Sequence, residues 1–459
     1  MTRTIRNACM PINRFPPEIL SSVLEHRTSD LDLVVATRVC RYWRYTLTSS
    51  PCLWTSFRFS GPNRDVNRTL TYLERSKSAP IDVRVGVGRP QDLEVLKYLA
   101  PHITRTRSLA IQGYYTEVCA ASLLLRTPSP ILQHLEISAY RGLVRLPDDF
   151  LGQQAPSLRS LSLDGIDTAF ESHFPLPNLT EFKLSLPEGA GPFRVGALFQ
   201  FLSGCPSLQK ICIDSKEMPE EITLGQVISL ESLVDLSYTC SSVGQILPYL
   251  RLPRLERLRV SSSFGSGQEQ RLADLLPHGG HVLLAGATKM SYYSYKSSQE
   301  LRLRGKGTDL SFVTSHPVAD RTPVYRFFDE AYIPFGQIED LTVGGSFTAD
   351  FPINILAFKN LRVLRIVPQG VGFAEWLLPS LYPHPGTEIP CRSLQEIQYG
   401  HLESTSPLMD LVRERKRAGH PLGLVGLLTL TGHGPGQDLV EELKEHVEEV
   451  RIGKWDGTT

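Results

Sequence analysis

The sequence lacks an excess of either charge and lacks long apolar runs. Lysine plus arginine equal aspartate plus glutamate at 48 each over 459 residues, so the formal net charge is zero. No global field therefore exists to hold the chain on nucleic acid or on an anionic membrane. No apolar stretch approaches the ~20 residues that span a bilayer, and the N-terminus has no apolar signal-peptide core. We expect a cytoplasmic or nuclear protein that binds neither nucleic acid nor membrane.

Cysteine is scarce and follows no pattern. The eight cysteines are scattered, with no Cys-x-x-Cys pair and no companion histidines at zinc spacing. The sequence also has no phosphate loop, no His-Glu-x-x-His helix and no Gly-x-Ser-x-Gly elbow. His278 and His281 lie close together, but a metal site needs three or four converging ligands. We therefore predict no metal site, no cofactor and no catalytic residues, and hence a protein that is not an enzyme.

A short phrase of the form Leu-x-x-Leu-x-Leu recurs through most of the chain. Successive copies begin 21 to 29 residues apart, from "LQHLEI" at Leu132 to "LERLRV" at Leu255. This spacing is typical of leucine-rich repeats. The other copies begin at Thr106, Leu158, Leu179, Leu208, Leu233, Ile338, Leu361 and Leu394, and a degenerate copy, "SQELRL", begins at Ser298.

Each phrase predicts a short strand, because its apolar positions alternate and therefore face one core. Between the phrases, apolar residues recur at helical intervals over 195–205, 242–250 and 270–278. A single repeat cannot bury both its strand and its helix, whereas stacked repeats can. We predict an α/β solenoid over residues 101–455, with parallel strands on the concave side and helices and loops on the convex side. One doubly wound α/β domain is the alternative.

The N-terminal segment has a different pattern. In "FPPEIL" the prolines suit a first helical turn, and Glu18 suits the positive end of the helix dipole. A second apolar periodicity predicts a helix from Leu31 to about Leu47, and "SSPCLW" ends it and delivers Trp54. We expect residues 11–57 to form a bundle of three small helices. Residues 58–100 would be a linker or the first turns of the solenoid.

The order and spacing of "FPPEIL", "VCRYW" and "SPCLW" resemble the F-box at the head of many fungal F-box proteins, and the repeats resemble an irregular leucine-rich repeat array. The resemblance implies a substrate-recognition subunit that docks on a Skp-family adaptor and through it joins a cullin-RING ubiquitin ligase. The solenoid would bind a protein substrate that the sequence does not identify. The adaptor-binding residues that the resemblance implies are Phe15, Pro16, Pro17, Ile19, Leu20, Val23, Val39, Cys40 and Trp43.

Two alternatives stay open. Each of these side chains could instead pack inside the small bundle, and the protein would then be a leucine-rich repeat scaffold whose N-terminal helices only cap the solenoid. Burial of Ile19 and Leu20 would favour the cap, and exposure would favour the ligase subunit. A hydrolase would require Ser, His and Asp to converge in a pocket. We expect substrate contacts first in the irregular segment 261–325, which contains the aromatic run "YYSYK" at 292–296.

Overall fold

The computed structural model divides the chain into two compact units, unit 1 over Met1–Glu220 and unit 2 over Glu221–Thr459. The residues that the structure describes are 10–25, 30–60, 64–89, 92–167, 176–187, 195–215, 227–240, 246–263, 270–295, 298–315, 325–326, 333–345, 354–368, 377–384, 386, 388–400, 405–429 and 437–454.

Unit 1 begins with a small helical module. Its helices are α2 (Pro17–Glu25), α3 (Asp30–Ala36) and α4 (Arg41–Ser49), flanked by 3-10 turns at Pro11–Arg14 and Pro51–Trp54. The apolar core of the module contains Leu20, Leu33, Ala36, Leu47, Leu53 and Trp54, each at most 5% exposed.

The single helix predicted over 31–47 is wrong, because the chain breaks between α3 and α4. The Thr37 hydroxyl donates a hydrogen bond of 2.7 Å to the Val34 carbonyl, a local bond that competes with helix continuation. Cys40 is fully extended, at φ −156° and ψ 175°, and the Arg44 Nε donates to the Thr37 carbonyl at 3.1 Å. The buried side of α3 also differs from the predicted stripe, because Val35 and Val39 are 62% and 54% exposed whereas Leu33 and Ala36 are buried.

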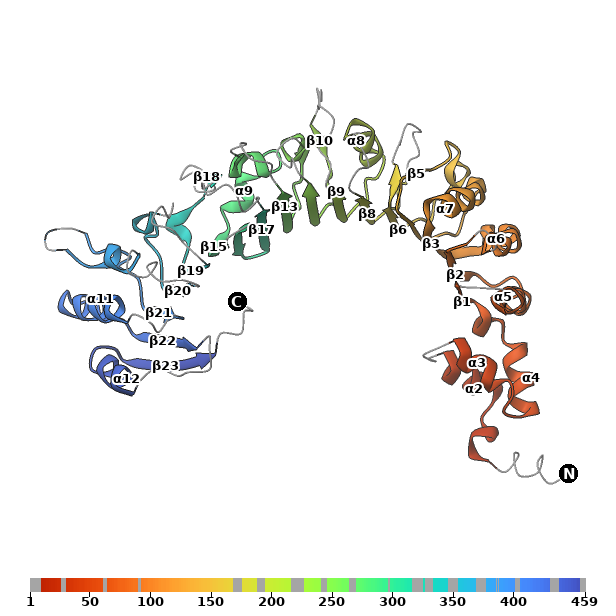
Figure 1. Cartoon of the computed structure of the whole chain (residues 1–459), viewed down its shortest axis with the longest axis horizontal. Helices are drawn as coiled ribbons and strands as arrows, with labels where there is room; N and C mark the ends of the chain where they lie inside the picture. Colours follow the sequence, from red (N-terminus) through yellow and green to blue (C-terminus); the bar gives the residue numbers. More distant parts are fainter. Residues whose placement is uncertain are drawn as a thin grey trace. The chain divides into compact units, whose positions relative to one another are not determined.

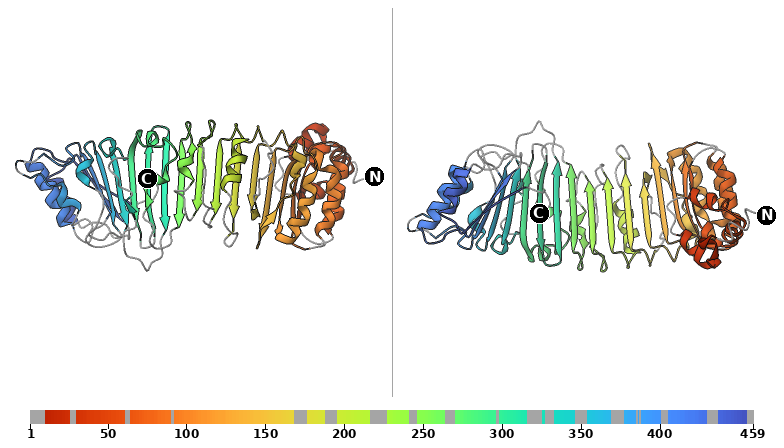
Figure 2. Two further views of the ribbon diagram at one scale, coloured as in Figure 1. Left: turned by 90° about the horizontal axis from the view of Figure 1, so that it is seen from above. Right: turned by 90° about the horizontal axis from the view of Figure 1, so that it is seen from below.

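The rest of unit 1 is a parallel sheet covered by helices on one side. Its strands pair in chain order and lie side by side in Figure 2. They are β1 (Ser56–Ser60), β2 (Ile81–Val87), β3 (Thr106–Tyr114), β4 (His134–Tyr140), β6 (Ser160–Asp164), β8 (Glu181–Leu186) and β9 (Lys210–Ser215). A small separate pair joins β5 (Val144–Arg145) to β7 (Ile166–Asp167).

The covering elements of unit 1 lie on the same side of its strands (Figure 1). They are α5 (Arg64–Arg75), α6 (Leu93–Leu99), α7 (Tyr115–Ser122) and α8 (Val195–Ser203), with 3-10 turns at Ala100–Arg105, Leu123–Arg126 and Phe150–Gln153. Alternate strand residues such as Leu161 and Leu163 point into the core beneath them and are at most 2% exposed. The residues between them form the opposite surface of each sheet, which we call the open face.

Unit 2 repeats this arrangement with ten strands in one sheet among its described residues. Its strands are β11 (Asp235–Cys240), β13 (Arg257–Ser263), β15 (Ala287–Ser294), β16 (Ser298–Gly305), β17 (Thr308–Ser315), β19 (Asp340–Gly345), β20 (Val363–Pro368), β21 (Glu396–Tyr399), β22 (Leu424–Thr429) and β23 (Glu449–Lys454). Two short pairs join β10 (Ile228–Ser229) to β12 (Leu250–Arg251) and β14 (Gln270–Arg271) to β18 (Tyr325–Arg326).

Three strands of unit 2 form a meander inside the parallel sheet. β13 pairs with β17, then β16 and β15 follow, and β15 pairs with β19. β16 runs antiparallel to both its neighbours, so the phrase at Ser298 is a strand but not a parallel repeat. The reason is the connection to β17, a two-residue turn with Gly307 at φ +81°, since parallel strands would need a long crossover.

The covering elements of unit 2 are shorter than predicted in two places. In the described part of 242–250 the helical element is the 3-10 turn Leu247–Tyr249, and in 270–278 it is the 3-10 turn Leu272–Leu275. Pro248 and Pro277 lack the backbone N–H that a longer helix needs. The other elements are α9 (His281–Leu284), α11 (Ser406–Arg417), α12 (Gln437–Lys444) and 3-10 turns at Phe335–Gln337, Ile355–Ala357 and Leu378–Leu381.

Both units therefore have the predicted architecture. In unit 1 a small helical module precedes the sheet, and in both units the strands, parallel except at β16, have helices and turns on one side, as in an α/β solenoid. The prediction is confirmed for the class of fold, and the meander is the departure from it.

Candidate functional site: the N-terminal helical module

Hydrogen bonds from α4 hold the leader that precedes α2. The indole Nε1 of Trp43 donates to the Asn13 side-chain oxygen at 2.6 Å, and the Tyr42 hydroxyl donates to the Phe15 carbonyl at 2.5 Å. α2 then begins at Pro17, where the missing N–H has no helical partner to lose. The leader is thus attached to the module by groups about 30 residues further along the chain, which fixes where Phe15 is presented.

Six of the nine predicted adaptor-binding residues are exposed. Phe15 is 46% exposed, Ile19 47%, Val23 56% and Val39 54%, and Pro16 and Pro17 are exposed as well. Ile19 and Val23 are four residues apart on α2 and therefore lie on one face of the helix. Apolar side chains that a folded module leaves in solvent mark a surface for a partner when they gather on one element.

The other three residues are less accessible. Leu20 is 1% exposed and packs in the core of the module. Trp43 and Cys40 are half-buried, and Trp43 donates the hydrogen bond to Asn13. Leu20 is therefore a packing residue in this structure, because it lies about 100° around the helix from Ile19.

Trp54 joins the helical module to the first turn of the sheet. Its side chain is fully buried, its Nε1 donates to the Leu47 carbonyl at 2.7 Å, and its ring meets the Tyr72 ring of α5 edge-on at 4.9 Å. The Arg75 guanidinium lies 4.3 Å from the indole centroid, within cation–π range. The sequence marks Trp54 only as the end of the module, and its partners on α5 carry no signal in the sequence.

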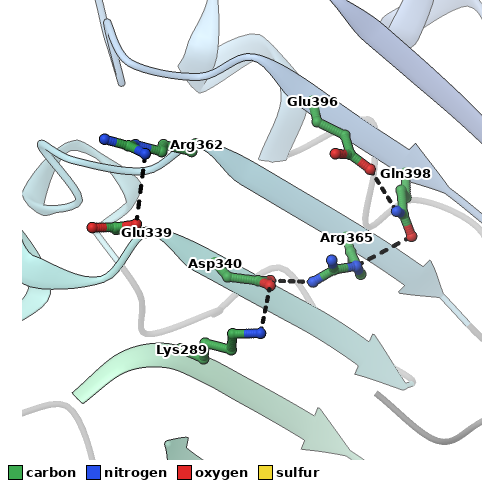
Figure 3. A network of polar contacts seen from close by, with 7 residues as sticks. All are labelled: Lys289, Glu339, Asp340, Arg362, Arg365, Glu396 and Gln398. Atoms are coloured by element: carbon green, nitrogen blue, oxygen red, sulfur yellow. Dashed lines mark hydrogen bonds and ion pairs between the residues drawn. The ribbon is translucent and has the colours of Figure 1, made fainter. Parts of the chain in front are cut away.

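The open face of unit 2 carries a network of charged and polar groups across β15, β19, β20 and β21 (Figure 3). Asp340 pairs with Arg365, and it also lies 4.0 Å from the Lys289 ammonium. Arg365 donates to the Gln398 side-chain oxygen at 3.2 Å, and Gln398 donates to Glu396 at 2.6 Å. Burial lowers the pKa of Arg365, but the hydrogen bond and charge of Asp340 and the charge of Glu396 outweigh burial and raise it.

The segment 261–325, where substrate contacts were expected, contains the meander. Tyr293 and Tyr295 stack at 6.3 Å and 7° between ring planes, while Tyr292 is buried in the core, where burial raises its pKa. Lys296 and residues 264–269 and 316–324 lie outside the described residues. The aromatic run is thus partly core and partly open face.

The groups considered for chemistry do not converge in the described part of the chain. His278 and His281 are both exposed, and among the described residues no group of three or more His, Cys, Asp or Glu side chains is placed to hold a metal ion. Burial raises the pKa of the Cys205 thiol to about 11 and that of Cys391 to about 12. These two thiols are protonated at neutral pH and are poor nucleophiles.

Comparison with known proteins assigns the helical module. Residues 12–60 match the F-box-like domain family. An Arabidopsis thaliana protein whose name describes it as F-box/LRR-repeat protein 22 is 25% identical over 226 residues, which cover 44% of this chain and 67% of the relative. The chain therefore has an F-box-like region followed by a repeat array of parallel strands, and its similarity to an F-box/LRR-repeat protein extends beyond the module. No helix among the described residues is long and apolar enough to cross a membrane.

Proposed function

We propose that this protein is the substrate-recognition subunit of a Skp-cullin-F-box type ubiquitin ligase. Its helical module would dock on a Skp-family adaptor, and its sheets would bind a protein substrate. One observation carries the proposal: an F-box-like module presents Phe15, Ile19 and Val23 to solvent on a hydrogen-bonded leader and one face of α2. Burial of such side chains against a partner contributes about 25 cal/mol for each Å² removed from water.

The joint at Trp54 supports this function. A recognition subunit has to hold its substrate in a fixed position relative to its docking module, because proximity and orientation are what it supplies to the reaction. Trp54 is shared between the core of the module and α5, so no free hinge separates the module from the first sheet turn. The catalytic chemistry would belong to other subunits.

We extend the proposal to the organisation of the chain and to its location. The F-box would cover residues 11–57 and the solenoid would cover 101–455, with β1, α5, β2 and α6 between them. The protein would act in the cytoplasm or the nucleus, without a cofactor. The exposed contact residues would be Phe15, Pro16, Pro17, Ile19, Val23 and Val39, with Cys40 and Trp43 at the margin and Leu20 supporting α2 from the core.

A scaffold whose N-terminal helices only cap the sheet is the second candidate. The burial of Leu20 favours a packing role for α2, whereas the exposure of Ile19 favours a docking role. A helix that served only as a cap would have no need for Ile19 and Val23 at 47% and 56% exposure on its outer face.

Co-expression with a Skp-family adaptor tests the proposal. In a pull-down of the full chain, Ile19→Asp and Val23→Asp should each reduce retained adaptor by about 30-fold or more, because an aspartate in an apolar interface costs about 2 kcal/mol or more. Tyr45→Asp is the matched control, because Tyr45 is 73% exposed on α4 and outside the predicted set.

Thermal melting of each variant shows whether the module still folds. A substitution at Leu20 is unsuitable, because a charge there would disrupt the core. Retention of the adaptor by both α2 variants, or no binding by the folded wild-type chain, would leave the scaffold as the better explanation.

A further inference from the structure

Two arginines lie side by side on the open face of unit 1, and neither has an acidic partner among the described residues. Arg58 of β1 and Arg84 of β2 are directly paired in the parallel register, and both are exposed. Neighbouring strands are about 4.8 Å apart, so both side chains leave the sheet next to each other. Neither guanidinium forms an ion pair with any residue that the structure describes. Like charges directly opposite one another destabilise a sheet.

The nearby aspartate, Asp82, is already paired with a third arginine, Arg107. The register between β2 and β3 shifts after Ile81, so Arg107 is the extra residue of a β-bulge. Bulges re-aim side chains, and Arg107 directs its guanidinium to Asp82, with Nε 3.0 Å from Oδ1 and a second bond from Nη2 to Oδ2. Asp82 precedes Arg84 by two residues on the same face, so the bulge removes the carboxylate best placed to neutralise the pair.

The arginines border a hollow of about 830 Å³ in the open face. Three arginines and one aspartate line it, which gives a net formal charge of +2 when His134 is neutral. Gly86 and Ala110, two small residues, lie beside the pair, and Ala110 separates Arg84 from Glu136 on β4. The guanidinium groups are thus open to a ligand from solvent.

We propose that Arg58 and Arg84 form a binding site for an anionic side chain in a peptide segment of a partner protein. Guanidinium groups bind carboxylate and phosphate by paired, charge-assisted hydrogen bonds, and two adjacent guanidiniums suit one such group or two consecutive acidic residues. A nucleic acid fits less well, because its phosphates need a row of cations and Asp82 and Glu136 flank the pair. The inference rests on the proposed function to the extent that the partner is the ligase substrate.

An exposed aromatic pair lies on the next two strands of the same sheet. Tyr114 of β3 and Tyr140 of β4 are paired in register at the carboxyl ends of their strands. Their rings are 6.5 Å apart and T-shaped, and their side chains are 45% and 46% exposed. Tyrosine and arginine are the residues that concentrate binding energy in protein interfaces. The partner segment therefore places its acidic group at the arginines and an apolar group near the tyrosines.

Fluorescence anisotropy with the full chain tests the site. The probes are three labelled peptides of about twelve residues on a Gly-Ser-Ala background with a tyrosine at one end, and their centres are Glu-Glu, phosphoserine or Gln-Gln. An oligonucleotide of similar length is the fourth probe. We expect binding of the Glu-Glu or the phosphoserine peptide, and the tighter of the two identifies the anion. The double variant Arg58→Gln/Arg84→Gln should weaken that binding about tenfold or more.

Arg259→Gln is the matched control. Arg259 is an exposed arginine on the open face of unit 2, and its in-register neighbours on β11 and β17 are serines. The proposal would be overturned if Arg259→Gln lost as much binding as the double variant, or if the Gln-Gln peptide bound as tightly as the acidic peptides. It would also be overturned if the oligonucleotide bound more tightly than the peptides, or if no peptide bound. The double variant should still retain the adaptor, so failure of the peptide site is separate from failure of the docking function.

Discussion

On the open face of unit 2, two in-register pairs match an arginine with a carboxylate, whereas one in-register pair of unit 1 places two arginines opposite each other. Arg257 of β13 lies 3.0 Å from Asp235 of β11, and Arg304 of β16 lies 3.4 Å from Asp309 of β17. Arg58 and Arg84 are also paired across neighbouring strands, and neither has a carboxylate partner in the part of the chain that the structure describes. Arg257 and Asp235 are in-register partners on parallel strands, as Arg58 and Arg84 are, so the difference between these two pairs lies in their side chains.

This difference separates a stabilising surface from a recognition surface. In an arginine–carboxylate pair the hydrogen-bond donors of the guanidinium are used by the carboxylate. In a pair of arginines the repulsion weakens the sheet, and the donors remain available to a ligand. Functional sites commonly carry such local costs to stability. The comparison gives substitutions with opposite expected signs in the two units.

The largest effect is expected at Asp340, the centre of the unit 2 network. Asp340→Ala should lower the free energy of unfolding by about 3 kcal/mol, because it removes the carboxylate paired directly with Arg365, whose side chain is only 16% exposed. Urea unfolding followed by circular dichroism measures the loss, and hydrogen exchange in peptides covering β19 and β20 locates it. The double variant Asp340→Ala/Arg365→Met should recover much of the stability. A loss below about 0.5 kcal/mol would show that the network is solvent-screened, as ordinary surface pairs are.

Reversing one charge should make unit 1 resemble unit 2. Arg84→Glu places a carboxylate opposite Arg58 and should raise the unfolding free energy by about 1 kcal/mol, because repulsion is replaced by attraction. The same variant should lose the acidic peptide. A decrease in stability would mean that the arginines do not repel each other in the folded chain, and the contrast between the two faces would fail.

The strands of both faces were predictable from the sequence, but their direction and partners were not. Leu161 and Leu163 alternate with polar residues, and this period of two identifies a strand and its buried side. The same period in "SQELRL" fits either direction, so a parallel repeat was expected where β16 is antiparallel. The short Lys306–Gly307 turn was the signal that could have corrected it.

The candidate docking site was also predictable only in part. The order of "FPPEIL", "VCRYW" and "SPCLW" located the module, and the F-box-like match covers it. Ile19 and Leu20 are adjacent and both apolar, so the sequence did not show which of the two is exposed and which is buried. That depends on which side of α2 packs against the rest of the module. It also could not place Arg107, since a bulge depends on the register between two strands.

Single neutral substitutions should give small effects of opposite sign. Arg84→Gln removes a repulsion and should stabilise the chain by about 0.5 kcal/mol. Arg257→Gln removes an attraction to Asp235, whose side chain is 10% exposed, and should destabilise it by about 0.5 kcal/mol. Differential scanning calorimetry of both variants beside the wild type measures the two signs. Equal shifts in one direction would indicate a general effect of removing arginine and would erase the distinction.

Salt should reduce the smallest of these differences further. At about 1 M ionic strength the Debye length is about 3 Å, which is shorter than the spacing between adjacent strands. The stabilisation by Arg84→Gln should therefore shrink toward zero in high salt, and binding of the acidic peptide to the wild type should weaken in parallel. The Asp340→Ala loss should persist, because both carboxylate and guanidinium are largely shielded from solvent by the protein. If the Arg84→Gln difference were instead independent of salt, its origin would be packing at Ala110 and Gly86, and Arg58 and Arg84 would be an ordinary solvated pair.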